Sequence, residues 1–250
     1  MKINLITGGS RGLGRSMALN VADKGQDVII TYHSKKAEAE AVVKEINAKG
    51  RKAVALQLDV SKSGSFDAFV AAVKQALVGT WKRDHFDHLV NNAGTGISAN
   101  IDAQSEAGFD EMMNIHLKAP FFLTQKLLPL MADKGSIINV SSGLARYSFP
   151  ERSAYAMMKG GIEVFTRYLA KELGARGITA NTLAPGAIAT DFGGGLVRDN
   201  PQINAQIAGQ TALGRIGEAD DIGALVAAML SDDFRWVNGQ RIEASGGFYL

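Results

Sequence analysis

Short apolar runs alternate with longer stretches of mixed polarity along this chain. Compact runs rich in Ile, Leu and Val are typical of buried strands, whereas apolar residues that recur every three or four positions are typical of helices. On this basis strands are predicted at residues 3–6, 27–32, 53–58, 87–90, 136–140, 178–183 and about 241–243. Helices are predicted from about 17 to 25 and at 35–48, 65–77, 106–131, 153–175 and 219–230.

The order of these elements predicts the fold class. Strands that alternate with helices through short connections pair in parallel, with right-handed crossovers. We therefore expect an α/β fold, a doubly wound parallel sheet of the Rossmann type with helices on both faces. No linker, repeat or low-complexity segment divides residues 1–250, so a single domain is predicted. Pro120 should disturb the helix at 106–131, because it has no N–H for the carbonyl of His116.

Composition narrows the classes of protein. Apolar residues make up 46% of the chain and charged residues 21%, an ordinary balance for a globular domain. A net charge of +2 favours neither a nucleic-acid partner nor a membrane surface. The absence of cysteine excludes disulfides and thiolate catalysis. No apolar run reaches the ~18 residues of a membrane span, and glycines interrupt the N-terminus before a signal-peptide core can form, so a cytoplasmic address is expected.

The segment from Ser142 to Lys159 holds a hydroxyl, a phenol and an ammonium group. Tyr155 and Lys159 are four residues apart and would share one face of a helix. Ser142 ends the apolar run before that helix, so a strand end could bring its hydroxyl to the phenol. A phenol titrates near pH ~10, and a cation one turn away favours the phenolate and lowers its pKa. This set favours proton exchange with a substrate oxygen, the alternative being a Tyr and a Lys at chance helical spacing.

Other distinctive motifs also follow strands, where doubly wound sheets bind their ligands. Gly8, Gly12 and Gly14 lie in the first strand-to-helix turn, where missing side chains let the backbone approach a pyrophosphate. The alternative is a glycine-rich turn without a ligand. Asp59 could accept a hydrogen bond from an adenine amino group or could equally cap a helix. The segment 91–94 could pass along a cofactor or could form an Asx turn.

No metal site is expected. His85 and His88 lie among aspartates just before and within a predicted strand, a pattern more typical of a solvated entry loop than of metal ligands. The G-x-S-x-G motif of serine hydrolases is absent, so that class is excluded at its first requirement.

Taken together, these residues resemble the short-chain dehydrogenase/reductase family. The resemblance runs from residue 3 to Gly247, and it is closest to the 3-oxoacyl-[acyl carrier protein] reductases and the related glucose dehydrogenase type. The motifs that carry it are Thr7-Gly-x-x-x-Gly-x-Gly14, Asn91-Asn-Ala-Gly94, Asn114, Ser142, Tyr155-x-x-x-Lys159 and Pro185-Gly186.

The resemblance implies a role for each matched residue. Tyr155 would be the general acid for carbonyl reduction and the base for alcohol oxidation, and Ser142 rather than Ser141 would bond the reacting oxygen. Lys159 would bind the nicotinamide ribose, and the carbonyl of Asn114 would hold a water. His116 is expected to pack or to line the substrate side. The expected cofactor-binding residues are Gly8, Ser10, Arg11, Gly12, Leu13, Gly14, Tyr32, His33, Ser34, Lys35, Asp59, Val60, Asn91, Ala93, Gly94, Tyr155, Lys159, Pro185, Gly186, Ile188 and Thr190.

The end of the second predicted strand predicts which cofactor is used. An NAD enzyme of this fold usually presents a carboxylate there, for the ribose 2′-hydroxyl. This chain has Tyr32, followed by His33, Ser34 and Lys35, and Arg11 lies inside the glycine turn. Hydroxyl and basic groups can bind a 2′-phosphate, which a carboxylate would repel. NADP(H) is therefore expected in preference to NAD(H), the alternative being ordinary solvated charges and use of either cofactor.

The substrate side is less well defined by sequence. Residues 190–217 contain Gly193, Gly194 and Gly195 among apolar residues, and could form a lid over an apolar substrate, or a hairpin packed permanently on the body. Arginines between Ser142 and Tyr155 would suit an acidic substrate or carrier, although Glu151 partly offsets them. The expected substrate-side residues are Ser142, Leu144, Tyr147, Phe149 and Phe192.

Two functions remain open. The first is an NADP(H)-dependent oxidoreductase that interconverts a ketone and a secondary alcohol, with a carrier-bound 3-oxoacyl thioester as one candidate substrate. The second is a dinucleotide-binding regulatory or scaffold protein with little turnover. The family resemblance also implies a homotetramer, with the helices at 106–131 and 153–175 at one interface and the C-terminal helix and strand at the other.

Overall fold

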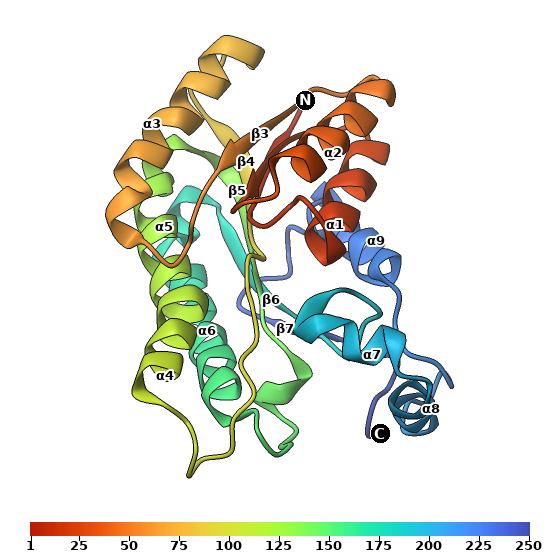
Figure 1. Cartoon of the computed structure of the whole chain (residues 1–250). Helices are drawn as coiled ribbons and strands as arrows, with labels where there is room; N and C mark the ends of the chain where they lie inside the picture. The colour runs from red at the N-terminus through yellow and green to blue at the C-terminus, as the bar shows by residue number, and fades with distance from the viewer.

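A single parallel sheet of seven strands organises all 250 residues of this computed structural model (Figure 1). The strand order is β3-β2-β1-β4-β5-β6-β7, and every neighbouring pair is parallel. The strand order reverses between β1 and β4. Sheets of this kind bind their ligands in the crevice at the carboxyl ends of the two strands where the order reverses. The strands are β1 (Ile3–Ile6), β2 (Asp27–Tyr32), β3 (Ala53–Gln57), β4 (Phe86–Asn91), β5 (Met131–Val140), β6 (Thr179–Pro185) and β7 (Arg241–Ala244).

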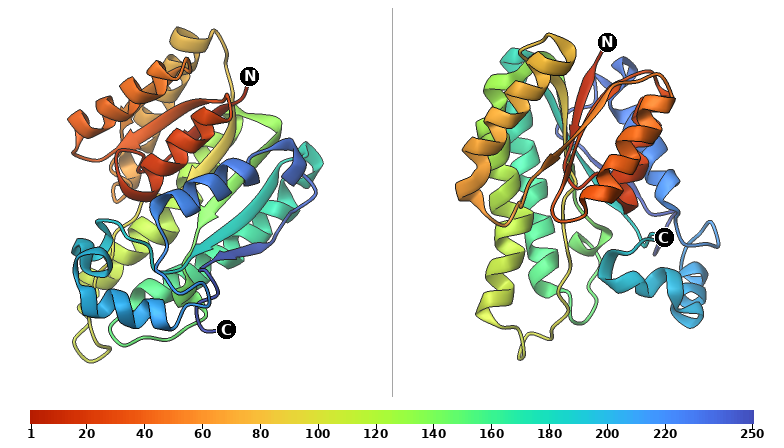
Figure 2. Two further views of the ribbon diagram at one scale, coloured as in Figure 1. Left: turned by 90° about the vertical axis from the view of Figure 1, so that its right-hand side faces the viewer. Right: turned by 45° about the horizontal axis from the view of Figure 1, so that its top comes forward.

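Helices cover both faces of this sheet, as the sequence predicts (Figure 2). One face carries α1 (Gly12–Asp23), α2 (Lys36–Ala48) and α9 (Ala219–Met229). The other face carries α3 (Phe66–Ala76), α4 (Glu106–Met113), α5 (Ala119–Leu127) and α6 (Ser153–Glu172). Each layer encloses its own buried cluster of aliphatic side chains, because strands buried on both faces have no polar side. The predicted fold class is confirmed.

The helices α1 and α9 pack unusually closely, although they lie near opposite ends of the chain. A Cβ atom on Gly223 of α9 would come within 2.2 Å of the Ser16 hydroxyl of α1. That hydroxyl donates to the Asp220 carboxylate at 2.6 Å. The first and last helices of the sandwich are therefore joined by direct contact.

The region predicted as one helix at 106–131 is interrupted. A π-helical turn, Asn114–Lys118, separates α4 from α5, and a short 3-10 turn, Leu128–Leu130, follows α5. Pro120 lies just after the π-helical turn and cannot donate to the carbonyl four residues before it, as expected. The strand β5 begins at Met131 instead of 136, because Met131 pairs with Phe86 across an irregular step in the register.

Residues 190–217 form a separate helical excursion from the sandwich. It contains α7 (Leu196–Asp199) and α8 (Pro201–Gly209), which Figures 1 and 2 show beyond the carboxyl ends of the strands. Gly193, Gly194 and Gly195 all have positive φ, from 63° to 79°, before α7. At the base of the excursion, Ala189 N–H donates to the carbonyl of Gly217 at 2.9 Å. The excursion is thus closed at its base, and whether it moves as a lid stays a prediction. None of the helices is long and apolar enough to cross a membrane.

Candidate active site

The first turn of α6 brings the expected phenol and hydroxyl together. Tyr155 is 9% exposed, and the Ser142 hydroxyl, just past the end of β5, lies close enough to the phenol to lower its pKa. The preceding Ser141 is turned elsewhere, because its hydroxyl bonds the Lys159 carbonyl at 3.2 Å and the Glu163 carboxylate at 2.7 Å. Of the two adjacent serines, Ser142 is the one that faces the phenol.

Burial sets the protonation of both Tyr155 and Lys159. Burial raises the pKa of Tyr155 to about 12, although the Ser142 hydrogen bond and the nearby Arg152 charge act in the opposite direction. Burial also lowers the pKa of Lys159 to about 7. The Lys159 Nζ donates to the carbonyl of Val140 at 2.7 Å and lies 5.4 Å from the centroid of the Tyr155 ring. The expected lowering of the phenol pKa is therefore not found in this structure, because removal from water raises that pKa and Lys159 is not among the groups that lower it.

The π-helical turn places two further polar residues near this pair. Asn114, at its start, is half-buried, and its carbonyl accepts a hydrogen bond from Ala119 N–H. A carbonyl oxygen can accept a second bond, so the expected water at Asn114 stays a prediction. His116, in the middle of the turn, is 2% exposed and meets the Tyr155 ring edge-on, with ring centroids 5.0 Å apart.

The glycine turn after β1 is packed in a way that only glycine permits. Gly8 has φ +70°, and a Cβ on it would lie 2.9 Å from the Cα of Ala93. A Cβ on Gly14 would lie 2.1 Å from the carbonyl oxygen of Gly8. Gly12 has φ +54°, in the left-handed region that other residues rarely adopt. No side chain of these glycines therefore covers the backbone at the start of α1, as the approach of a pyrophosphate would require.

A pair of residues without a role in the sequence-based prediction ties this turn to the segment after β4. The Thr7 hydroxyl accepts from the N–H groups of Asn92, at 2.9 Å, and Ala93, at 3.0 Å. The Asn92 amide donates to the carbonyl of Thr7 at 2.8 Å. By contrast, the Asn91 amide points into the core, where it donates to the side chains of Thr124 and Asn139. Only the main chain of Asn91 remains for a cofactor, and Thr7 and Asn92 hold that main chain in place.

The segment 185–190 reaches the same turn from the other side. A Cβ on Gly186 would lie 2.8 Å from the Cα of Ser245, so this segment passes tightly against the end of β7. Thr190 is buried. A Cβ on Gly12 would lie 3.7 Å from the Thr190 Cβ, which is an ordinary van der Waals contact. The structure thus brings together the glycine turn and the segment expected to line a nicotinamide.

The groups expected to bind a 2′-phosphate meet at the end of β2. The glycine turn is fixed there, because Gly9 N–H donates to the carbonyl of Thr31 at 2.8 Å. Arg11 is exposed and its guanidinium makes no hydrogen bond or ion pair within the chain. Tyr32 is half-buried, whereas 33–35 are exposed. These exposed groups form a basic corner, in which Lys35 lies 4.0 Å from the Glu38 carboxylate and His33 lies 3.5 Å from that of Asp59, while Arg11 has no such partner.

The Asp59 carboxylate beside this corner is already bonded within the chain. It accepts from the Ser61 hydroxyl at 2.6 Å and lies 3.2 Å from the Lys62 ammonium and 3.5 Å from the His33 ring. Burial alone would raise its pKa, but the bonds from Ser61 and Lys62 lower it. The Ser61 N–H also donates to it at 3.0 Å, which is an Asx turn and not the helix cap that was the alternative for this residue. A contact to adenine stays a prediction.

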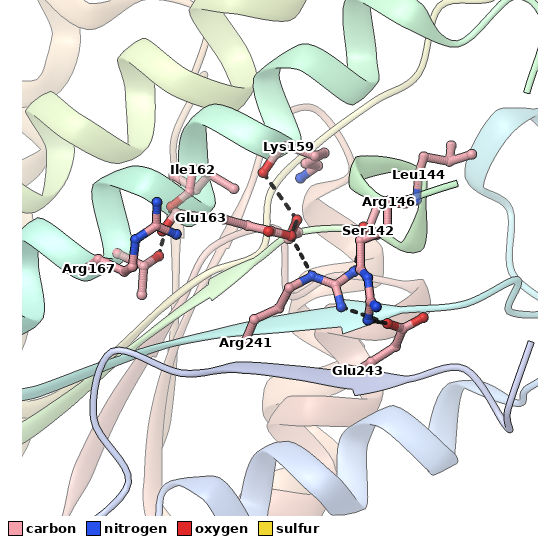
Figure 3. A network of polar contacts seen from close by, with 11 residues as sticks. Ser142, Leu144, Arg146, Lys159, Ile162, Glu163, Arg167, Arg241 and Glu243 are labelled. Atoms are coloured by element: carbon pink, nitrogen blue, oxygen red, sulfur yellow. Dashed lines mark hydrogen bonds and ion pairs between the residues drawn. The ribbon is translucent and has the colours of Figure 1, made fainter. Parts of the chain in front are cut away.

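An ionic network lies directly beneath Ser142 and Lys159 (Figure 3). Arg241 of β7 donates to the carboxylates of Glu163, at 2.7 Å, and Glu243, at 2.6 Å. Glu243 also binds Arg146 at 3.0 Å. The network joins β7 to α6 and to the chain after β5, and it keeps Arg146 paired instead of free for an acidic ligand.

Aromatic side chains gather on the substrate side. Phe192 of the excursion lies 5.9 Å from the Tyr155 ring, centroid to centroid. Tyr147 and Phe149 pack against Phe248 and Tyr249 near the C-terminus, with centroid distances of 5.5 to 6.2 Å. Leu144 packs at the edge of the small cluster that contains Tyr155. The C-terminal pair was not among the predicted substrate-side residues, since nothing in the local sequence links it to residues a hundred positions earlier.

Fold and site together define a class of protein. A doubly wound parallel sheet with a bare glycine turn at its reversal point, next to a buried Ser–Tyr–Lys set, is that of a dinucleotide-dependent oxidoreductase. No group of three or more His, Asp or Glu side chains is arranged to hold a metal ion.

Comparison with known proteins identifies the family. A family model described as enoyl-(acyl carrier protein) reductase matches residues 8–249. The 3-oxoacyl-[acyl-carrier-protein] reductase of Staphylococcus aureus is 36% identical over 251 residues, covering 100% of this chain and 98% of that protein. A promiscuous reductase that catalyses keto-reduction at C1 during lugdunomycin biosynthesis is 37% identical, with a TM-score of 0.94 over 99% of this chain and 97% of the other. The angucycline C-6 ketoreductase LanV, solved with bound NADP, is 33% identical, with a TM-score of 0.94 over 99% and 95% of the two chains.

These similarities extend over the whole chain. The chain belongs to the short-chain dehydrogenase/reductase family, and the resemblance inferred from its motifs is confirmed. It is an oxidoreductase that acts on CH–OH and keto groups.

Proposed function

We propose that this protein is an NADP(H)-dependent ketoreductase in which Tyr155 exchanges a proton with the substrate oxygen. The observation that carries the proposal is the meeting of Ser142, Tyr155 and Lys159 at the strand ends beside the glycine turn. The complete set also argues against the regulatory alternative, since a protein that only senses a dinucleotide needs the glycine turn alone.

The residues of the site divide the work of carbonyl reduction. The nicotinamide supplies a hydride when bound. The Ser142 hydroxyl orients the carbonyl oxygen, and the Tyr155 phenol donates its proton to that oxygen. With a pKa of about 12 the phenol is fully protonated at neutral pH, the state that reduction needs. The Lys159 ammonium, now bonded to the carbonyl of Val140, is within one helical turn of the phenol and can turn to ribose hydroxyls.

The bare glycine turn and the basic corner support NADP(H) as the cofactor. A turn without Cβ atoms can accept the pyrophosphate, and the unpaired Arg11 can reach a phosphate on the adenosine ribose. The similar reductase LanV was solved with bound NADP, which agrees with this assignment. The loop 32–35 would complete the phosphate site.

Two substrate classes are supported, each by a different observation. Full-length similarity to a 3-oxoacyl-[acyl-carrier-protein] reductase favours a 3-oxoacyl thioester. The aromatic side chains around the site, together with the pairing of Arg146 to Glu243, favour a planar aromatic ketone instead. Of the two arginines that an acidic carrier could contact, Arg146 is paired with Glu243, and Arg152 alone makes no ion pair.

A panel of carbonyl compounds separates these possibilities. We would follow the loss of NADPH absorbance with 3-oxoacyl thioesters, polycyclic aromatic ketones, simple ketones and sugars. Turnover with any ketone, abolished in Tyr155→Phe, supports the proposed function, and the ratio of kcat/KM values assigns the substrate class. If the unmutated enzyme and Tyr155→Phe both bind NADPH equally well and neither reduces any compound, the regulatory alternative is favoured.

We also propose a homotetramer. Exposed apolar side chains on α5 and α6 support the first interface, since they are unusual on a monomer surface. They are Phe121, Phe122, Met157, Val164 and Tyr168. The second interface is supported by Trp236, which is 95% exposed between α9 and β7.

A further inference from the structure

His116 is a buried polar side chain that packs against the ring of Tyr155. It is 2% exposed in the middle of the π-helical turn, and its ring meets the Tyr155 ring at an interplanar angle of 83°. The Lys159 charge is close enough to act on it, since burial first and that charge second lower the pKa of His116 to about 3. The imidazole is therefore neutral and adjoins both groups of the proton-transfer pair.

Its hydrogen bonds determine where the single ring proton lies. The His116 Nε2 is 2.6 Å from the carbonyl oxygen of Thr95. The Thr95 N–H also points at Nε2, at 3.4 Å, but the carbonyl contact is much the shorter of the two. Because a carbonyl oxygen can only accept, we assign the proton to Nε2, which donates to it. The other nitrogen, Nδ1, is left as an acceptor with a free lone pair.

That lone pair has no partner within the chain. The Nδ1 atom of His116 is fully buried and makes no hydrogen bond. A Cβ on Gly94 would lie 2.7 Å from the ring's Cε1 and 3.3 Å from Nδ1. The Nδ1 edge of the ring therefore faces Gly94, whose missing side chain leaves room there. A buried acceptor without a donor costs about 1–3 kcal/mol, which calls for an explanation in function.

We infer that His116 is a positioning residue of the catalytic centre: it fixes the Tyr155 ring against the segment after β4, and its Nδ1 accepts a hydrogen bond from an O–H donor at Gly94. This inference rests on the proposed function. The donor is a ribose hydroxyl of the bound nucleotide or an ordered water beside Lys159. Either one would link the phenol, the ammonium group and the segment 91–94 into one set, and would satisfy the only unpaired polar atom next to the reacting phenol.

Two substitutions at this position separate the two nitrogens. His116→Gln can keep a donor for the Thr95 carbonyl but has no acceptor at the Nδ1 position. His116→Asn keeps an oxygen at the Nδ1 position but cannot reach Thr95. We expect His116→Gln to keep its Tm within a few degrees while kcat falls about tenfold, which corresponds to ~1.4 kcal/mol. His116→Asn should lose more Tm and retain more of its kcat.

His88 offers a matched control. It is also a buried histidine, 3% exposed, and one ring nitrogen accepts from Ser136 N–H at 3.0 Å while the other has no partner. It lies in β4, on the sheet and away from Tyr155. His88→Asn should change Tm but leave kcat within about twofold.

The NADPH dissociation constant, measured by fluorescence in the same variants, identifies the donor. A weaker affinity in His116→Gln indicates a ribose hydroxyl, and an unchanged affinity with lowered kcat indicates a water. A His116→Gln enzyme with normal kcat and normal NADPH affinity would overturn the inference, because the Thr95 bond would then be the whole role of His116. The proposed function is judged separately, from the unmutated enzyme and Tyr155→Phe.

Discussion

Removal of the Arg11 guanidinium should weaken NADPH binding and leave NADH binding almost unchanged. Arg11 is exposed at the start of α1, makes no ion pair, and its side chain makes no capping bond to the helix. Arg11→Ala therefore removes no contact on which the fold depends. Any loss of affinity would report a contact with the cofactor itself.

The magnitude follows from the exposure of the guanidinium. A hydrogen bond to a charged group contributes roughly 1.5–3 kcal/mol. Because Arg11 lies in solvent, where water and salt screen a charge pair, the lower end applies, and about tenfold weaker NADPH binding is expected. NADH has no 2′-phosphate, so its affinity should change by less than about twofold.

Arg15→Ala is the matched control. Arg15 lies one helical turn further along α1 and is held by Glu45 at 2.7 Å. Both substitutions lower the formal net charge from +2 to +1, so a general electrostatic effect on an anionic ligand would appear in both. Dissociation constants for NADPH and NADH would be measured by fluorescence titration at two salt concentrations. Equal loss of NADPH affinity in the two variants, or equal loss for the two cofactors in Arg11→Ala, would refute the reasoning.

Four further predictions follow from the site and the surface. Tyr155→Phe should lower kcat at least ~10²-fold with NADPH affinity unchanged, and near-normal turnover would remove the phenol from the mechanism. In the direction of alcohol oxidation the unmutated enzyme needs the phenolate, so with a pKa of about 12 its rate should rise about tenfold per pH unit from pH 7 to 10; a plateau below pH 9 would contradict this. The pKa of Lys159 is about 7 when folded, below its usual 10.5, so burial of the ammonium costs stability fully below pH 7 and less as pH rises to 10.5. Lys159→Met should accordingly raise Tm more at pH 6 than at pH 10, and a pH-independent change in Tm would show that the charge is not the cause. Light scattering at micromolar concentration should give a tetramer, whereas a stable monomer would refute the two interfaces.

Much of the fold was predictable because its signal is local. Runs such as Val28–Ile30 are apolar, as is typical of strands buried on both faces, and their alternation with helices leaves few possible topologies. The start of β5 was not predictable, since residues 131–135 include Lys134, at φ 60°, and Gly135, and join the strand only through pairing with β4. The short helices between 192 and 209 likewise lack an apolar period of their own.

The sequence predicts which residues lie together at the site, but it does not predict how the fold shifts their pKa values. The end of a predicted strand places Ser142 near Tyr155, the family resemblance selects it over Ser141, and the structure brings the two residues together. The direction of the phenol pKa shift was wrong, because burial is a property of the assembled fold and not of a four-residue interval. His116 was expected only to pack or to line the substrate side, and its contact with the Tyr155 ring was not predicted, for a similar reason. A π-helical turn rotates it towards Tyr155, and regular α-helical spacing would not indicate that position.

The contact between α1 and α9 has a consequence for the order of folding during synthesis. The buried cluster on that face takes Met17 and Val21 from the first helix and Ile222 and Val226 from the last one. A ribosome releases the first helix some two hundred residues before its partner. Until then this part of the buried cluster stays incomplete, and the long sequence separation predicts that it forms slowly. Gly223 then serves as the closing point, because a bulkier residue there would keep the last helix from seating on Ser16.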